Sequence, residues 1–301
     1  MDDAHIYDAH DLKHDEGQLP PENWFDRSET LQKLRKNKKF PTIWCSGCGI
    51  GIVMGALIRA IDRLSLDIDK VALVAGIGCT ARMPVYMDFN TLHTTHGRAL
   101  AFATGLKIAR PDMKVIAIMG DGDAIAIGGN HFIHAARRNL GITAIVVNNT
   151  IYGMTGGQYS PTTPLGGLAT TAPYGNVEPP FPICDLAIAA GASYVARSTV
   201  YHALELDKFL AEAIAKDGFS VVEAVSYCHT TFGRLNKLGT AVDMMRSLKD
   251  NSLVKSALDK LSPEEQAANT KIVRGKFIDV DRPQYTQVYD NLITRTQIGE
   301  K

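Results

Sequence analysis

Two short motifs contain the residues best suited to chemistry in this sequence. Gly120-Asp121-Gly122-Asp123 is the first, and 25 residues separate Gly122 from the second, Asn148-Asn149. An aspartate carboxylate, an asparagine amide oxygen and a free backbone carbonyl form an oxygen-only ligand set, which suits Mg²⁺. The glycines beside Asp121 let the backbone approach a diphosphate and direct N–H groups at it. Asp-Gly alone is a common turn, but the paired motifs predict a magnesium and diphosphate site.

The expected secondary structure brings these motifs together. Gly120 directly follows an apolar run, Val115–Met119, and Asn148 directly follows another, Ile142–Val147. We expect both runs to be parallel strands, with the residues between them forming one helix. Ligands of open α/β sheets bind outside the carboxyl ends of the strands. Asp121 and Asn149 should therefore lie close together at one edge of the sheet.

The cysteines form a second group with chemical potential. Cys45-x2-Cys48 is by itself ambiguous between half a zinc site, a redox pair and half an iron–sulfur site. Cys79 and Cys228 each follow an expected strand and could complete a set of four thiolates, which is the ligand set of a [4Fe–4S] cluster. Zinc uses the same four ligands, although commonly as two close pairs. Cys184 lacks an evident partner and is expected to be a small buried apolar residue.

The elements that position these residues predict an α/β fold, a parallel sheet with helices on both faces. Strand-length apolar runs alternate with helical patterns, which is typical of βαβ units, and they read as continuous runs because both faces are covered. We expect the strands at 71–77, 115–119, 142–147, 193–196 and 219–225, and the helices near 50–63, 97–109, 128–139 and 205–216. A loop rich in glycine and proline, residues 151–182, interrupts this rhythm, and loops of that length are usually functional.

Three regions follow from this pattern. Residues 1–40 are expected to be an arm, acidic at its start and basic near 33–39; residues 41–230 the α/β domain; and residues 231–301 a polar extension that packs on a partner. In the extension we expect a helix near 252–260 and a capping box in Ser262-Pro-Glu-Glu265. The basic stretch of the arm could bind an acidic partner protein or a partner subunit.

Composition excludes several classes of function. Lysine plus arginine and aspartate plus glutamate both number 32, and the resulting zero net charge argues against a protein built for nucleic acid or an anionic membrane. The apolar runs are far shorter than the roughly 18 residues that span a bilayer. Residues 1–16 lack the apolar core of a secretory signal. We therefore expect a cytoplasmic protein, whose cysteines stay reduced.

The motifs taken together resemble a known family. GDG-x25-NN resembles the fingerprint of thiamine diphosphate enzymes. The flanking motifs resemble the β subunit of two-subunit 2-oxoacid:ferredoxin oxidoreductases over residues 40–235. These motifs are Trp44-Cys45-Ser46-Gly47-Cys48-Gly49, Gly76-Ile77-Gly78-Cys79, His96-Gly97-Arg98-Ala99 and Ile151-Tyr152-Gly153-Met154-Thr155-Gly156-Gly157-Gln158.

The resemblance implies a role for individual residues. Asp121, Asn149 and the carbonyl of Ile151 would hold Mg²⁺, and Cys45, Cys48, Cys79 and Cys228 a [4Fe–4S] cluster. Met154 would support the bent cofactor. Independently of the resemblance, Arg82 is a candidate clamp for a substrate carboxylate, because a guanidinium binds a carboxylate through two hydrogen bonds, with a structural ion pair as the alternative. The thiamine diphosphate contacts would be Ile77, Gly78, Cys79, Thr80, His96, Gly97, Gly122, Asp123, Asn149, Gly153, Met154 and Thr155.

The resemblance also implies an activity and partners. Such enzymes oxidatively decarboxylate a 2-oxoacid, pass electrons singly through the cluster to ferredoxin, and transfer the acyl group to coenzyme A. The chain has no matching sequence for the glutamate that activates the cofactor or for a coenzyme A domain, so we expect an α subunit and an (αβ)₂ assembly. We favour 2-oxoglutarate as substrate, with pyruvate or a broad 2-oxoacid range as the alternative. The rival functions are a non-redox thiamine diphosphate decarboxylase or ligase, and a non-catalytic subunit that carries a cluster.

Overall fold

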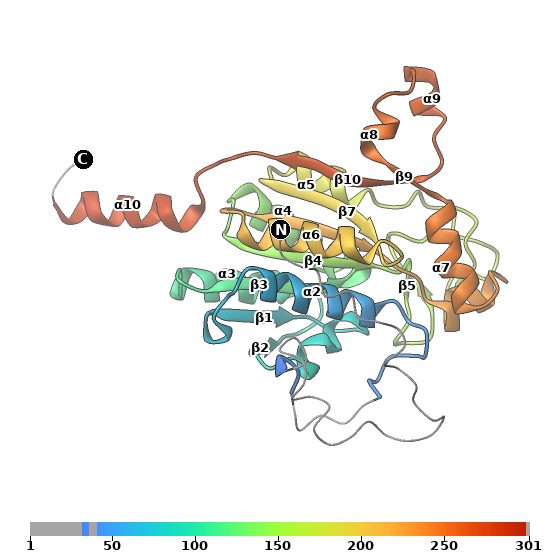
Figure 1. Ribbon diagram of the computed structural model, residues 1–301, viewed down its shortest axis with the longest axis horizontal. Helices are drawn as coiled ribbons and strands as arrows, with labels where there is room; N and C mark the ends of the chain where they lie inside the picture. The colour runs from blue at the N-terminus through green and yellow to red at the C-terminus, as the bar shows by residue number, and fades with distance from the viewer. Residues whose placement is uncertain (1–31, 36–40, 299–301) are drawn as a thin grey trace, which may run out of the picture.

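The computed structural model describes residues 32–35 and 41–298, and its centre is an eight-stranded sheet (Figure 1). The strands lie in the order β2-β1-β3-β4-β8-β7-β10-β9, and those from β2 to β7 are parallel to their neighbours, whereas β10 is antiparallel to β7. The bounds are β1 (Val71–Ala75), β2 (Asn90–His93), β3 (Lys114–Gly120), β4 (Ile142–Asn148), β7 (Tyr194–Thr199), β8 (Ser220–Val225), β9 (Ser252–Val254) and β10 (Ile272–Asp279). The predicted fold class is confirmed, with a mostly parallel sheet.

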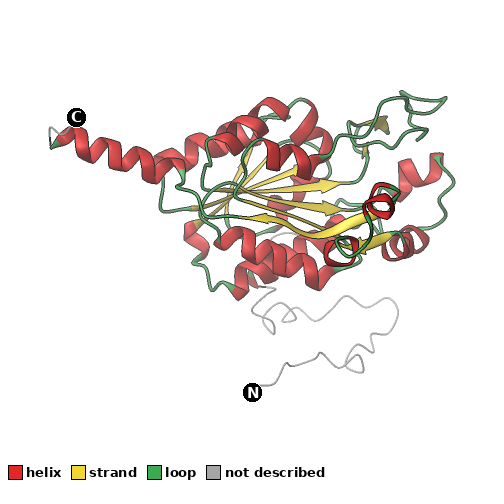
Figure 2. Cartoon of the chain, turned by 90° about the horizontal axis from the view of Figure 1, so that it is seen from above, coloured by secondary structure: helices red, strands yellow, loops and turns green. Residues whose placement is uncertain are grey.

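Helices cover both faces of this sheet, as Figure 2 shows in the view from above. One face carries α2 (Ile50–Arg63) and α6 (Ala203–Ala215), whose apolar residues share a buried cluster with the sheet. The other carries α3 (Ala99–Ala109), α4 (Gly129–Arg137) and α5 (Ile183–Ala189), which belong to a second cluster. Each face of the central strands is therefore shielded from water by its own helical layer.

The strands read as unbroken apolar runs because successive side chains enter different clusters. In β3, Ile116 and Ile118 pack in the α2–α6 cluster, whereas Val115, Ala117 and Met119 pack in the opposite one. Side chains alternate between the two faces of a strand, so both faces of a doubly covered strand must be apolar. This pattern made the central strands predictable.

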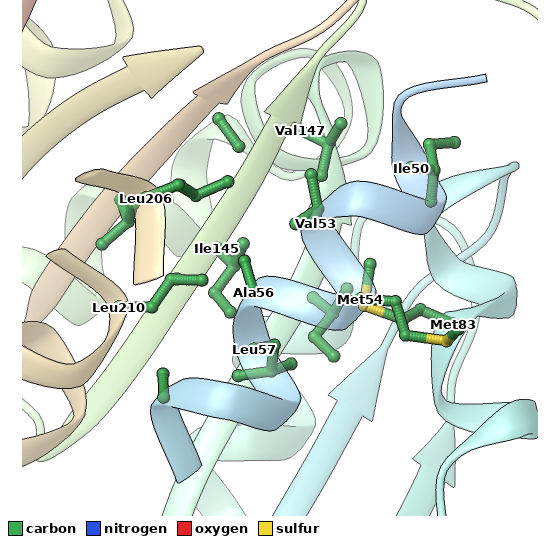
Figure 3. Close-up of a cluster of buried hydrophobic side chains, with 14 of the residues drawn as sticks. Ile50, Val53, Met54, Ala56, Leu57, Met83, Ile145, Val147, Leu206 and Leu210 are labelled. Atoms are coloured by element: carbon green, nitrogen blue, oxygen red, sulfur yellow. The ribbon is translucent and has the colours of Figure 1, made fainter. Parts of the chain in front are cut away.

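The α2–α6 cluster is closely packed around the middle of the sheet (Figure 3). Val53 and Leu57 of α2 belong to one cluster with Ile145 of β4 and Leu206 of α6, and all four are fully buried. Helix α2 begins one residue after Gly49, directly after the Cys45-x2-Cys48 motif. The packing of α2 therefore places those cysteines at one edge of the sheet.

Several elements differ from the sequence-based expectations. The segment after Asp121 is not one helix: a wide π-type turn, Gly122–Ala126, precedes α4. The helix expected near 97–109 begins at Ala99, so His96 and Gly97 lie before it. The prediction of a helix near 252–260 was wrong in part. The strand β9 occupies the start of this segment, and the helix α8 (Lys255–Leu258) occupies only its middle.

Besides β9, two further strands of the sheet, β2 and β10, were missed for physical reasons. All four residues of β2 are exposed, so this edge strand carries no apolar run. β10 is only partly buried and mixes charged with apolar residues. β2 is an edge strand, and β10 lies next to the short edge strand β9. Strands at or near an edge are held by backbone hydrogen bonds to their neighbours rather than by an apolar pattern.

Residues 231–301 contribute more to the domain than expected, because β10 extends the main sheet. Further helices are α7 (Ala241–Asp250), α9 (Pro263–Ala267) and α10 (Tyr285–Gln297). The predicted capping box is confirmed: Ser262 accepts the Glu265 N–H, and the Glu265 carboxylate accepts the Ser262 N–H. Helix α10 projects from the body of the molecule (Figure 1), and Thr286 is its one buried residue. Packing of this extension on a partner stays a prediction.

Most of the expected arm, residues 1–40, lies outside the described residues. Within 32–35, Leu34 is buried against the domain and forms an antiparallel bridge with Met87. Over the described ranges, none of the helices combines the length and apolar character needed to cross a bilayer.

An ion pair between α2 and α6 generates a prediction about stability. Arg59 donates from Nε and one terminal nitrogen to the two carboxylate oxygens of Asp207, at 2.7 and 2.9 Å, and Asp207 is 1% exposed. We expect Arg59→Met to lower the free energy of unfolding by about 2–3 kcal/mol, because it leaves a buried carboxylate unpaired. The double variant Arg59→Met/Asp207→Leu should recover most of this loss in urea unfolding. Equal stability of the wild type and the single variant would contradict this account.

Candidate functional site

A cavity opens at the carboxyl ends of β1, β3 and β4, where the sequence placed its two motifs. Its volume is about 650 Å³, including space that opens to solvent. The lining residues are Ile77, Gly78, Cys79, Thr80, His96, Gly120, Asp121, Gly122, Asp123, Asn149, Ile151, Tyr152, Gly153, Met154 and Thr155. The structure thus brings the expected residues together at the ends of three adjacent strands. Gly97 does not line the cavity, but its N–H donates to Asp123, which does.

Asp121 follows β3 and is buried beneath the cavity. Its Oδ2 accepts hydrogen bonds from the hydroxyls of Ser160 at 2.6 Å and Thr162 at 2.5 Å, both from the long loop. Burial raises the pKa of the Asp121 carboxyl, and these two donors oppose that shift. The hydroxyls therefore stabilise the carboxylate form that a cation would require.

The other oxygen of Asp121 faces Asn149 and Ile151. One terminal atom of the Asn149 amide lies 2.9 Å from the Ile151 carbonyl oxygen and 3.3 Å from Asp121 Oδ1. With nitrogen at that position the amide donates to both oxygens; with oxygen there, three oxygens converge on one point. Neighbouring ligands of an octahedral Mg²⁺ with 2.1 Å bonds are about 3 Å apart. The two distances from the Asn149 amide, to the Ile151 carbonyl and to Asp121 Oδ1, fit such an ion.

Asp123 also lines the cavity and accepts hydrogen bonds from the backbone of two other segments. Its Oδ1 accepts the N–H of Gly97 at 2.6 Å and that of Ile77 at 3.4 Å, and His96 Nδ1 lies 2.8 Å away. Burial raises the pKa of Asp123, opposed by the Gly97 N–H and by His96. Its Oδ2 is buried and has no hydrogen-bond partner within the described chain. Such an orphaned acceptor beside a cavity fits a donor group on a bound ligand.

Tyr152 is a lining residue that the residue-by-residue prediction missed. Its ring lies so close to Gly122 that a Cβ added there would be 2.1 Å from a ring carbon. Burial, and then the charges of Asp121 and Asp123, raise the pKa of the Tyr152 phenol. Its position between Ile151 and Gly153 in the quoted motif was the available signal. Only the fold shows that its ring requires a glycine at 122.

The two residues expected to act in catalysis have different surroundings. Met154 lines the cavity and is 46% exposed, consistent with an apolar support for a ligand. Arg82 lies in the 3-10 segment Thr80–Tyr86, and its side chain is not among the residues that line the cavity. Its buried Nε lacks a hydrogen-bond partner within the described residues. A role for Arg82 as a carboxylate clamp stays a prediction.

The four expected cysteines lie at the same edge of the sheet. Thr230 Oγ1 is 3.6 Å from the sulfurs of both Cys45 and Cys228. Burial raises the pKa of the Cys48 thiol to about 11, and the charges of the other three cysteines add to this. Burial also raises the pKa of Cys79, with further effects of Cys228 and Cys45. The four thiols therefore lie close enough together for their charges to interact.

Gly153 lies beside both the cavity and two of these thiols. A Cβ added to Gly153 would lie 3.3 Å from Cys228 Sγ and 3.9 Å from Cys79 Sγ, while its backbone lines the cavity on the other side. Cys79 lines the cavity directly. The cysteine group and the cavity are thus adjacent, and they meet at Gly153 and Cys79.

Cys184 is buried as expected, but its thiol does have a partner. It donates to Glu223 Oε2 at 3.2 Å, and Arg197 donates to the same oxygen at 2.7 Å. The other Glu223 oxygen accepts from the Asn148 amide at 2.8 Å. Cys184 therefore belongs to a buried network beneath the Asn148-Asn149 turn, separate from the four cysteines. In the part of the chain that the structure covers, no three His, Cys, Asp or Glu side chains converge as ligands of a single metal ion.

Comparisons with known proteins agree with this geometry. Residues 76–224 match the family model described as "Thiamine pyrophosphate enzyme, C-terminal TPP binding domain", thiamine pyrophosphate being another name for thiamine diphosphate. The 2-oxoglutarate synthase subunit KorB of Methanocaldococcus jannaschii is 49% identical over 263 residues, which cover 87% of this chain and 97% of that protein. This chain belongs to the KorB family of 2-oxoacid:ferredoxin oxidoreductase β subunits. The KorB protein of Archaeoglobus fulgidus is 51% identical over 255 residues, 84% of this chain and 93% of that one.

A solved structure extends the likeness of this KorB-family chain to three dimensions. The 2-oxoglutarate:ferredoxin oxidoreductase of Magnetococcus marinus, with 2-oxoglutarate, coenzyme A and succinyl-CoA bound, aligns with a TM-score of 0.79 and 32% identity over 92% of both chains. The expected family is confirmed, and so is the thiamine diphosphate-binding α/β fold.

The contact between Gly122 and Tyr152 generates a prediction. We expect Gly122→Ala to weaken thiamine diphosphate binding at least about ten-fold, roughly 1.4 kcal/mol, because the new methyl group displaces the Tyr152 ring into the cavity. Gly105→Ala in α3 is a matched control, since a Cβ there would meet no atom within 4 Å. Isothermal titration of both variants measures the difference. Unchanged affinity in Gly122→Ala would show that the ring does not delimit the cofactor site.

Proposed function

We propose that this chain is the β subunit of an enzyme that converts 2-oxoglutarate and coenzyme A to succinyl-CoA and CO₂ and reduces ferredoxin. The main supporting observation is that a cavity with converging oxygen ligands lies directly beside a group of four cysteine thiols, with Gly153 and Cys79 between them. Neither a plain decarboxylase nor an electron carrier without catalysis would need both halves of this arrangement.

The cavity residues fit thiamine diphosphate with Mg²⁺. Asp121, Asn149 and the carbonyl of Ile151 would hold the ion, and the orphaned Asp123 Oδ2 is available to a donor on the cofactor. Bound thiamine diphosphate supplies the electron sink that allows a 2-oxoacid to lose CO₂. The chain itself orients the diphosphate at the strand ends and supports the cofactor with Met154.

The four cysteines fit a [4Fe–4S] cluster better than zinc. A single ion needs its ligands to converge closely, and among the described residues no three Cys, His, Asp or Glu side chains do so. A cluster of four irons is bound by four thiolates that lie farther apart. Cluster ligands are thiolates, so binding must release the protons that the raised pKa values retain. A cluster bound there, next to the cavity, would accept electrons one at a time.

The proposal includes partners that this chain lacks. An α subunit would supply the coenzyme A domain and the glutamate that activates the cofactor, in an (αβ)₂ assembly. Support comes from the names of the KorB relatives, which are given as subunits. A cytoplasmic location is consistent with five cysteines that form no disulfide. Ferredoxin is proposed as the acceptor because the name of the solved relative includes it.

Substrate preference rests on the relatives. The KorB proteins are named 2-oxoglutarate synthase subunits, and the solved relative has 2-oxoglutarate and succinyl-CoA bound. We therefore propose 2-oxoglutarate, ahead of pyruvate or a broad range of 2-oxoacids.

The test of the whole proposal uses the chain co-expressed with its α subunit. We expect viologen or ferredoxin reduction that needs coenzyme A and is fastest with 2-oxoglutarate among a panel of 2-oxoacids. The chain purified alone should lack this activity. Full coenzyme A-dependent activity of the isolated chain would overturn the need for an α subunit, and equal rates with pyruvate would overturn the proposed substrate preference.

Replacement of single cysteines tests the cluster. We expect Cys45→Ser or Cys228→Ser to lose visible absorbance and bound iron, because each removes one of four thiolate ligands. Cys184→Ser is the matched control: serine keeps a donor to Glu223, so the iron content should equal that of the wild type. Equal iron in all three variants would contradict the ligand set, and stoichiometric zinc without iron in the wild type would favour the alternative metal.

The Arg82 proposal has its own measurement. If Arg82 binds the distal carboxylate of the substrate, Arg82→Met should lower kcat/KM for 2-oxoglutarate by about ten-fold or more while sparing pyruvate, which has no distal carboxylate. Equal losses for both substrates would make Arg82 a structural residue.

A further inference from the structure

The two oxygens of Asp121 have different surroundings. Oδ1 faces the Asn149 amide at 3.3 Å, toward the proposed Mg²⁺ position, whereas Oδ2 accepts the hydroxyls of Ser160 and Thr162. Ser160 is 2% exposed and Thr162 is 4% exposed, so water does not compete for these bonds. A carboxylate whose second oxygen is held by two buried donors is constrained to use one oxygen for a cation.

The same segment also holds the other half of the ligand set. Thr163, which is fully buried, donates from its hydroxyl to the carbonyl oxygen of Thr150 at 2.6 Å and accepts the Ser160 N–H at 2.8 Å. Thr150 lies between Asn149 and Ile151 and has a φ of +63°, a strained value for a β-branched residue. The hydroxyl of Thr163 therefore stabilises the turn that brings the Ile151 carbonyl within 2.9 Å of the Asn149 amide.

We infer that Ser160, Thr162 and Thr163, here called the bracing segment, are positioning residues for the magnesium ion. This inference rests on the proposed function, because it concerns the cation that would hold the cofactor diphosphate. The bracing segment restricts Asp121 to monodentate binding through Oδ1 and sets the distance between the ligands that follow β3 and β4. It selects Mg²⁺ over Ca²⁺, since Mg²⁺ demands near-ideal octahedral geometry whereas Ca²⁺ accepts bidentate carboxylates at longer distances.

The segment gains its position from the fold of the long loop. Asn176 donates to the carbonyl of Thr163 at 2.8 Å and to that of Glu178 at 2.8 Å, which ties the far part of the loop to the bracing segment. Met154 and Thr155, which line the cavity, begin the same loop. The loop that supports the cofactor is thus anchored on the carboxylate that would bind its metal.

Matched variants separate this role from a general effect on stability. Thr162→Val removes the hydroxyl at nearly constant shape, Thr162→Ser retains it, and Ser160→Ala is a milder change should Thr162→Val fold poorly. Thr143→Val is the control: Thr143 is also buried, and its hydroxyl donates to the Ala213 carbonyl at 3.1 Å at the far end of β4.

The experiment measures thiamine diphosphate binding to the co-purified αβ enzyme, stripped of cofactor, as a function of added Mg²⁺ or Ca²⁺, together with the thermal unfolding midpoint. We expect Thr162→Val and Ser160→Ala to raise the Mg²⁺ concentration needed for half-maximal binding by about 10- to 100-fold, the usual effect of losing an outer-shell partner. The Ca²⁺ requirement should rise less, so the preference for Mg²⁺ falls. Thr162→Ser and Thr143→Val should match the wild type.

Two results would overturn the inference while leaving the proposed function intact. One is an unchanged Mg²⁺ requirement in Thr162→Val and Ser160→Ala. The other is an equal rise in both the Mg²⁺ and the Ca²⁺ requirement, which would mean a purely structural role. A wild-type enzyme that binds no thiamine diphosphate with either cation would instead overturn the proposed function, and this inference with it.

Discussion

The site depends on one buried carboxylate at the end of β3. Asp121 has lost nearly all contact with water, and burial of an unpaired charge is costly. Its stability as an anion therefore depends on two hydroxyls from the long loop, and the cation proposed beside Asn149 would stabilise it further. This constraint explains why the loop, the Asn148-Asn149 turn and the end of β3 form one unit.

The rest of the fold serves to hold that edge of the sheet in place. The α2–α6 layer and the α3–α4–α5 layer bury both faces of β3 and β4, so the ends of these strands have a fixed separation. Beneath the Asn148-Asn149 turn, the network of Glu223, Arg197 and Cys184 links β4 to its neighbour β8 and to β7 beyond it. Positional precision at the ligands thus comes from packed strands rather than from the loop alone.

The cysteine group is assembled in a different way. Cys45 and Cys48 precede α2, Cys79 follows β1, and Cys228 follows β8, so their proximity depends on the packing of α2 against the sheet. Gly153 lets the cavity approach these thiols because any larger residue would meet the sulfur of Cys228. The proposed electron path therefore depends on the absence of a side chain at one position.

The sequence by itself determined the central strands, the edge of the sheet that carries the site, and the residues that converge there. It could do so because doubly covered strands must be apolar on both faces, and because ligand residues directly follow such strands. Only the tertiary structure decided the positions of β2 and β10, the partner of Cys184 and the contact between Tyr152 and Gly122. It also showed that Ser160 and Thr162 bind Asp121 across some 40 residues of chain. Strands at or near the edge of a sheet need no apolar pattern, so β2 and β10 carried no periodic signal. Serine and threonine are common in loops, so their hydrogen bonds to a distant carboxylate leave no signal in the sequence either.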